Sequence, residues 1–141
     1  LLQGLDGTEG GKATFEATAR LTIREGKLEA FKQQAAEVLR QMREQDEQPL
    51  RYDWFLSDDG TECEVREAYL DADALIEHSQ HIGEARNKLF RDFADGHTVV
   101  FYGEPSPALA KAMEAMPPGA VTVKQFFAFQ PDAEIAAPVS A

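Results

Sequence analysis

Two ionisable side chains near the middle of the chain, Glu67 and His78, have the chemistry needed for proton transfer. Imidazole titrates near neutral pH, so His78 is suited to act as a base or as a hydrogen-bond partner of a substrate. Glu67 shares a predicted strand face with Val65 and Tyr69, where a carboxylate among apolar neighbours is unfavourable unless it is paired or protonated. We therefore expect His78 and Glu67 to be catalytic, with Glu67 adjusting the local pKa. The structural alternatives are a solvent-facing histidine at a helix edge and a glutamate in an ion pair or a helix cap.

Aromatic and imidazole side chains close to this pair could form the walls of a binding site. Trp54, the only tryptophan, shares a strand face with Tyr52, so the two rings could pack against a flat aromatic ligand or simply belong to the core. His81 follows His78 by three residues, which puts both on roughly one side of a helix. No metal site is expected, because no third inward ligand accompanies the two histidines. The expected substrate-binding residues are Trp54, Tyr69, Tyr52 and His81.

The periodicity of apolar residues predicts the elements that position these side chains. Residues 13–23 alternate between apolar and polar along their whole length, and 50–57 and 61–70 are two further strands. Between the latter two, residues 58–60 (Asp-Asp-Gly) predict a tight hairpin turn in which glycine takes a positive φ. Apolar residues recur at helical spacing over 28–45, between the first strand and the second.

The second half of the chain begins with helical spacing and then returns to strand patterns. Asp71 or Asp73 can cap the helix that follows the hairpin, and Gly83 interrupts that helix. Ser106 followed by a proline predicts the start of another helix. The expected elements are two helical segments around Gly83 that end at Gly96, a strand over 97–103, a helix from Ser106 that ends at Pro117, and a last strand over 121–129.

The order of these elements indicates the fold class. Strand, helix, strand, strand, helix, strand is the ferredoxin-like βαββαβ order, an α+β arrangement with two helices on one face of an antiparallel sheet. We expect one domain over residues 13–104 and a helix–strand extension of the same domain over 105–130. Residues 1–12 are expected to be a loose leader, and residues 131–141 a loose tail.

The sheet face that the helices leave uncovered is expected to be partly apolar. It carries Phe55 and one side of the fourth strand, either Val99 and Phe101 or Val100 and Tyr102. Such a face is suited to packing against a second sheet. The last strand is apolar on both faces and follows a linking helix, so it could be exchanged with a neighbouring copy. We therefore predict a homodimer, with exchange of the last strand as an open alternative.

Composition excludes several classes of partner. The 141 residues carry a formal net charge of -11, which would repel phosphate groups, so no nucleic acid is expected as a partner. No apolar run approaches the ~20 residues that span a bilayer, so no membrane is expected either. The single cysteine, Cys63, excludes an internal disulfide, and with no export signal in the sequence we expect a cytoplasmic protein.

The stretch from Arg51 to Ala85 resembles the antibiotic biosynthesis monooxygenase (ABM) family of the dimeric α+β barrel superfamily. The resemblance lies in an aromatic strand that contains Trp54, in Glu67-Ala68-Tyr69 at the end of the next strand, and in His78 on the following helix. It implies oxidation of a quinol or polyphenol-like small aromatic molecule by O₂, with no metal, haem or flavin cofactor. A base near neutrality and an apolar enclosure suit this chemistry, because a deprotonated phenol reacts more readily with O₂.

Two positions depart from the pattern of that family. Its oxygenases carry an asparagine on the first strand, whereas the only asparagine here is Asn87, and Tyr69 stands where many relatives have tryptophan. The functional interpretation therefore stays open between three alternatives. They are a cofactor-independent monooxygenase, a non-catalytic small-molecule binding or sensor protein, and a cofactor-free isomerase.

Overall fold

The computed structural model describes residues 14–45, 49–116 and 119–129, and these form one five-stranded sheet with four helices. The predicted leader and tail, residues 1–12 and 131–141, lie outside the described residues. No helix within these described segments combines the length and the hydropathy of a membrane span. In chain order the elements are β1 (Phe15–Ile23), α2 (Leu28–Gln45), β2 (Arg51–Leu56), β3 (Glu62–Tyr69), α3 (Ala72–His81), α4 (Gly83–Phe93), β4 (Ala94–Tyr102), α5 (Pro107–Glu114) and β5 (Thr122–Phe126).

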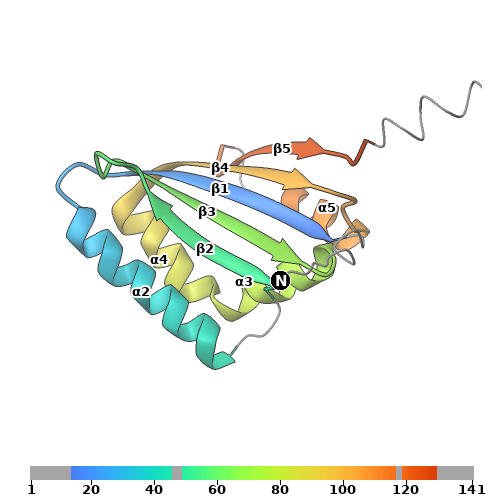
Figure 1. Cartoon of the computed structure of the whole chain (residues 1–141), viewed down its shortest axis with the longest axis horizontal. Coiled ribbons are helices and arrows are strands. Elements are labelled where there is room, and N and C mark those ends of the chain that lie inside the picture. Colours follow the sequence, from blue (N-terminus) through green and yellow to red (C-terminus); the bar gives the residue numbers. More distant parts are fainter. Residues whose placement is uncertain (1–13, 46–48, 117–118, 130–141) are drawn as a thin grey trace, which may run out of the picture.

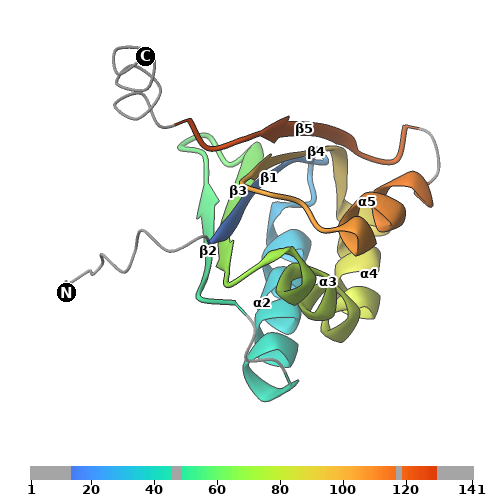
Figure 2. The same cartoon turned by 90° about the vertical axis from the view of Figure 1, so that its right-hand side faces the viewer.

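The strands lie in the order β2-β3-β1-β4-β5, and each neighbouring pair is antiparallel except β4 and β5, which run parallel. Helices α2, α3 and α4 cover one face of the sheet, and α5 lies on the same side beside α3 (Figure 1; Figure 2). The first four strands, with α2 and the α3–α4 pair, follow the βαββαβ order. The predicted ferredoxin-like α+β fold is therefore confirmed, and α5 with β5 extends it.

Periodicity explains why β1 and α2 form the centre of this arrangement. Every second residue of β1 from Phe15 to Ile23 is buried, and the residues between them are more exposed, as the alternating sequence predicts. On α2, the buried residues Phe31, Ala35 and Val38 are spaced by four and three positions, so they form one stripe against the sheet. The helix begins and ends at the two residues that its sequence pattern predicted.

The fourth strand begins earlier than the sequence predicts. We expected a helix that ends at Gly96 and a strand from His97, but α4 ends at Phe93 and β4 already begins at Ala94. The register between β1 and β4 shifts here, so that Gly96 and His97 together lie opposite Leu21. This β-bulge needs a positive φ, and Gly96 supplies it with φ 64°. The glycine therefore belongs to the strand rather than to a turn.

The last strand is shorter than predicted and pairs within its own chain. β5 covers Thr122–Phe126 instead of 121–129, because its partner β4 ends at Tyr102, which lies opposite Phe126. Phe127 and Phe129 follow the end of the strand and are exposed. Exchange of this strand between two copies stays a prediction.

Asp71 is the N-cap of α3, one of the two residues that the sequence proposed for this role. Its carboxylate accepts a hydrogen bond of 2.9 Å from the Ala74 N–H. Asp71→Ala is expected to lower the free energy of unfolding by about 1 kcal/mol, because this N–H loses its acceptor. Asp73→Ala, in the same first turn, is the matched control and should lower it by less. Urea unfolding measures both variants, and equal losses would contradict the capping role.

Candidate functional site

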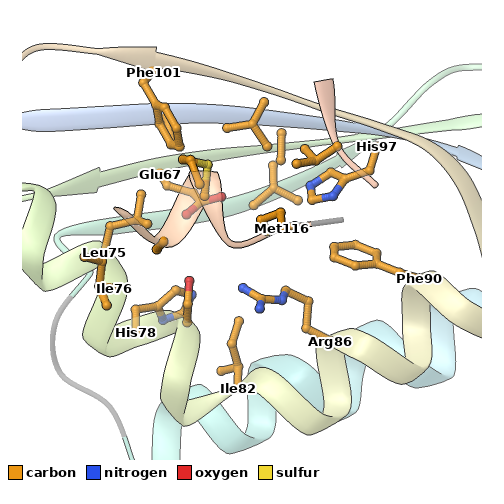
Figure 3. A pocket seen from close by; sticks show the side chains of 18 of the residues that line it. Glu67, Leu75, Ile76, His78, Ile82, Arg86, Phe90, His97, Phe101 and Met116 are labelled. Atoms are coloured by element: carbon orange, nitrogen blue, oxygen red, sulfur yellow. The ribbon is translucent and has the colours of Figure 1, made fainter. Parts of the chain in front are cut away.

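A cavity of about 440 Å³ lies between the sheet and the helices. Its lining comes from the inward faces of β1 to β4, from α3 and α4, and from α5 and the segment that follows it. Figure 3 shows Glu67 and His97 projecting into the cavity from the sheet, and His78, Arg86 and Phe90 from the helices. Most of the lining side chains are apolar. Water therefore screens the few charged groups weakly, and their interactions with one another and with a ligand are strong.

Glu67 supplies a carboxyl group to this cavity. The Tyr69 hydroxyl donates a hydrogen bond of 2.5 Å to Glu67 Oε1, so the predicted pair on the inward face of β3 is present. Burial raises the pKa of Glu67 from its ordinary value of 4.5 to about 7, while the Tyr69 hydrogen bond and the charge of Arg86 limit the rise. About half of the molecules therefore carry an ionised Glu67 at neutral pH. Such a carboxyl group can both accept and donate a proton.

His78 lines the cavity from α3, across from Glu67 on the sheet (Figure 3). Its side chain is buried, and its ring meets the edge of the Tyr52 ring at a centroid distance of 4.4 Å. The Tyr69 ring lies 5.7 Å away on another side. Burial, followed by the charge of Glu67, raises the pKa of Tyr52 well above 10, so this phenol stays neutral. Tyr52 and His78 therefore form one polar, aromatic end of the cavity.

The other predicted binding residues occupy three different positions relative to the cavity. Trp54 lines it, and its ring packs between those of Phe31 and Tyr52 at 6.4 and 5.9 Å. Tyr69 is fully buried and is not part of the lining, so it acts on the site through its hydrogen bond to Glu67. His81 is also not among the lining residues.

Two polar residues of the lining, Arg86 and His97, were not singled out from the sequence. Arg86 on α4 is four residues from both Ile82 and Phe90, so all three lie on one side of the helix. This spacing from two inward apolar residues could have indicated that Arg86 also faces inward. His97 packs its ring on Phe90 at 4.3 Å. Burial, aided by the charge of Arg86, lowers the pKa of His97 to about 4, so the imidazole is neutral at physiological pH. This histidine lies on the same face of β4 as Val99 and Phe101, and the sequence left open whether that face or the opposite one turns inward.

Neither a reactive thiol nor a group of metal ligands is found in the described part of the cavity. Cys63 is buried, and burial raises the pKa of its thiol to about 11, so it serves as a small core residue. Within residues 14–45, 49–116 and 119–129, no three His, Cys, Asp or Glu side chains are grouped as a metal site would require.

Comparison with known families identifies the relatives of this chain. Residues 14–95 match the family described as antibiotic biosynthesis monooxygenase, abbreviated ABM. The chain belongs to the ABM family. The matched segment extends from the start of β1 to the first residues of β4, so it includes Glu67 and His78 and leaves α5 and β5 outside. The resemblance inferred from the sequence is therefore confirmed.

Solved structures share the fold of this ABM domain. MupZ from Pseudomonas fluorescens is 26% identical, with a TM-score of 0.66 over 92% of this chain and 92% of its own. Rv0793 from Mycobacterium tuberculosis is 21% identical, with a TM-score of 0.56 over 68% of this chain and 99% of its own. A further structure, described as an antibiotic biosynthesis monooxygenase, is 20% identical, with a TM-score of 0.56 over 66% of this chain and 99% of its own. Comparison with curated proteins gave no match.

Proposed function

We propose that this ABM-family protein is a cofactor-independent monooxygenase that oxidises a quinol- or polyphenol-like small molecule with O₂. The observation that carries the proposal is the Glu67 carboxyl group, with its pKa of about 7, inside a largely apolar cavity. A phenol must lose its proton, with a pKa of about 10, before it reacts readily with O₂. The raised pKa makes Glu67 a stronger base than an exposed carboxylate, so Glu67 rather than His78 accepts this proton.

The reaction balances with O₂ as the oxidant. For hydroquinone, C₆H₆O₂ and O₂ give hydroxybenzoquinone, C₆H₄O₃, and H₂O. Glu67 accepts a phenolic proton, the phenolate transfers one electron to O₂, and the two radicals combine to form a carbon–oxygen bond. The carbon that bears the peroxide then loses its hydrogen as a proton while the O–O bond breaks. The departing oxygen takes up this proton and the one that Glu67 returns, and it leaves as water. One oxygen atom enters the product, and the substrate supplies all four electrons.

The remaining lining residues have supporting roles in this proposal. Trp54 and Tyr52 form an aromatic wall against which a flat ring can stack. His78, beside Tyr52, donates or accepts a hydrogen bond that orients the substrate. Tyr69 positions Glu67 and keeps its pKa from rising further. An apolar enclosure also protects reactive oxygen intermediates from water.

Oxygen uptake and isotope labelling test the proposed reaction. With hydroquinone as substrate, we expect protein-dependent O₂ consumption above the rate of spontaneous oxidation. With ¹⁸O₂, mass spectrometry should find one labelled oxygen atom in each product molecule. The absence of both signals, with the substrate bound and chemically unchanged, would instead identify a non-catalytic binding protein.

A cofactor-free isomerase is a second candidate, and the protonation state of Glu67 favours it. An isomerase must remove a proton from one position of its substrate and return it to another. A carboxyl group with a pKa of about 7 can do both at neutral pH. In addition, β1 contains no asparagine, the residue that oxygenases of this family carry on their first strand. For this reaction the product has the mass of the substrate and carries no label from ¹⁸O₂.

Tyr69→Phe is expected to move the acidic limb of the pH–rate profile to higher pH. The Tyr69 hydrogen bond lowers the pKa of Glu67, so its loss raises this pKa and leaves less ionised base at neutral pH. At pH 7 the rate should fall by roughly threefold or more, and it should recover at higher pH. Steady-state kcat/KM across the pH range measures the limb. Tyr102→Phe on the outer sheet face is the control, and a limb that moves in neither variant would contradict the assigned base.

A homodimer is proposed from the sheet face that the helices leave uncovered. Phe55, Tyr102 and Phe126 lie on this face and are 49%, 42% and 46% exposed, and the last two rings stack at 5.7 Å. We expect the chain to sediment as a dimer and Phe126→Asp to shift it toward the monomer, because a charge would then be buried at the interface. Gln33→Asp on the exposed side of α2 should leave the dimer intact. Wild-type protein that sediments as a monomer would remove this prediction.

A further inference from the structure

Arg86 projects from α4 into the mostly apolar cavity. Its side chain leaves α4 between Ile82 and Phe90 and points toward the centre of the cavity (Figure 3). Within the described part of the chain, Arg86 forms no ion pair, and its buried Nε has no hydrogen-bond partner. The one ring contact of the guanidinium is with Phe90, at 5.9 Å from the ring centroid. The half-buried guanidinium of Arg86 therefore has hydrogen-bonding capacity that a ligand in the cavity can use.

The charges that face Arg86 do not neutralise it. Glu67 on β3 is about half ionised at neutral pH, as its pKa of about 7 requires, and His97 on β4 is neutral. Tyr52 on β2 is a neutral phenol, and His78 on α3 would add positive charge if it were protonated. The cavity therefore carries a net positive charge at neutral pH, although the whole chain has a net charge of -11.

We propose that Arg86 binds a carboxylate of the ligand, so that the cavity selects apolar molecules that carry a single carboxylate group. A guanidinium matches a carboxylate with two parallel hydrogen bonds, and these are strong where water is excluded. His97 and Phe90 lie beside this position, the first as a neutral hydrogen-bonding group and the second as an apolar contact. One fixed positive charge balances one carboxylate but not a phosphate with two charges. The inference concerns the cavity of the proposed function and names the class of its ligand.

Binding of a carboxylate would also change Glu67. The charge of Arg86 lowers the pKa of Glu67, and a bound anion would offset that charge and add a repulsion of its own. Glu67 therefore takes up a proton when the anion binds. By linkage, the added affinity is complete below the pKa of the free protein, about 7, and it is lost as the pH rises through the higher pKa of the complex.

Titration calorimetry with three probes of one shape tests the proposal on the full chain. Sodium 1-naphthoate carries the carboxylate, 1-naphthamide is its neutral counterpart, and 1-naphthol carries a phenol in its place. At about pH 6 we expect the naphthoate to bind at least tenfold more tightly than either neutral probe. Preference for 1-naphthol would show that the anion at Arg86 is an ionised phenol, and it would overturn the carboxylate assignment.

Variants of two residues on α4 separate a local contact from general charge. Arg86→Gln is expected to abolish the preference for the naphthoate, whereas Arg86→Lys, which keeps the charge, should retain part of it. Lys88→Gln removes the same charge from an exposed position of the same helix and should retain the whole preference. Equal loss in the Arg86→Gln and Lys88→Gln variants, or equal binding of the naphthoate and the naphthamide by the wild type, would overturn the proposal.

A third variant tests the link to Glu67 and keeps this proposal distinct from the proposed reaction. The affinity of the wild type for the naphthoate should fall severalfold between about pH 6 and about pH 8. Glu67→Gln should retain the preference for the naphthoate but lose this pH dependence. Oxygen consumption by the wild type without a preference for the carboxylate would overturn only the present inference. A preference for the carboxylate without oxygen consumption would overturn only the monooxygenase.

Discussion

Replacing Glu67 by glutamine is expected to slow turnover of a quinol substrate at least a hundredfold at neutral pH. The amide has the shape of the carboxylate, and its oxygen can still accept the hydrogen bond of the Tyr69 hydroxyl. It cannot accept a proton, so the variant loses the contribution of a general base, which is typically ~10²–10⁴-fold. The loss should appear in kcat, because the substrate still fits the same cavity. Steady-state oxygen uptake, corrected for spontaneous oxidation, measures it.

Two matched variants distinguish the base from its neighbours. Glu64→Gln makes the same change on the outer face of the same strand, where Glu64 pairs with Arg20 at 2.8 Å, and should leave turnover nearly unchanged. His78→Ala, a residue first expected to be the base, should slow turnover roughly tenfold through the loss of orientation. A Glu67→Gln variant that retains its activity while His78→Ala loses more than a hundredfold would reverse the two roles.

Local patterns were sufficient to predict the elements that carry this site. The apolar stripe of α2 and the alternation of β1 predicted both elements to within one or two residues. The same alternation predicted that Glu67 and Tyr69 share the inward face of β3, and the hydrogen bond between them follows from that placement. These features depend on neighbours in the sequence, so they can be inferred without knowledge of the tertiary structure.

The polar side chains opposite Glu67 depend on contacts that local patterns do not contain. His97 faces the cavity because it alternates with Val99 and Phe101 along β4, and the sequence left open which of the two faces of this strand turns inward. Arg86 was not predicted to line the cavity, because an arginine on an amphipathic helix usually faces solvent. The lining that Met113 and Met116 add to the cavity depends on how α5 packs against α3, and these two helices lie far apart in the sequence. Sequence therefore predicted the frame and the shared face of Glu67 and Tyr69, but not the charge balance around them.

The second large expected effect concerns the pH dependence of stability. Glu67 and His97 should change the free energy of unfolding in opposite directions as the pH rises. The pKa of Glu67 is about 7 in the folded chain and near 4.5 when exposed, so between these pH values the folded state holds the additional proton. Stability from this group is therefore complete below pH 4.5 and is lost as the pH rises to 7. The change in the free energy of unfolding is at most about 3 kcal/mol.

His97 acts in the opposite sense over nearly the same interval. Its pKa is about 4 in the folded chain and near 6.5 when exposed, so between these values the unfolded state holds the additional proton. Stability from this group is present above pH 6.5 and is lost as the pH falls to 4, again by at most about 3 kcal/mol. Between pH 4.5 and 6.5 the two contributions nearly cancel in the wild type.

Single substitutions should therefore reveal two opposite slopes. Relative to the wild type, Glu67→Gln should gain stability as the pH rises from 4.5 to 6.5, and His97→Gln should lose it. Urea unfolding at several pH values measures the slopes, and a constant offset from altered packing does not change them. Surface carboxylates with lowered pKa values titrate alike in all three proteins, so they drop out of the difference; these are Glu37, Asp59 and Asp92. Parallel pH profiles for the three proteins would contradict both pKa shifts, and with them the net positive charge that would draw a carboxylate to Arg86.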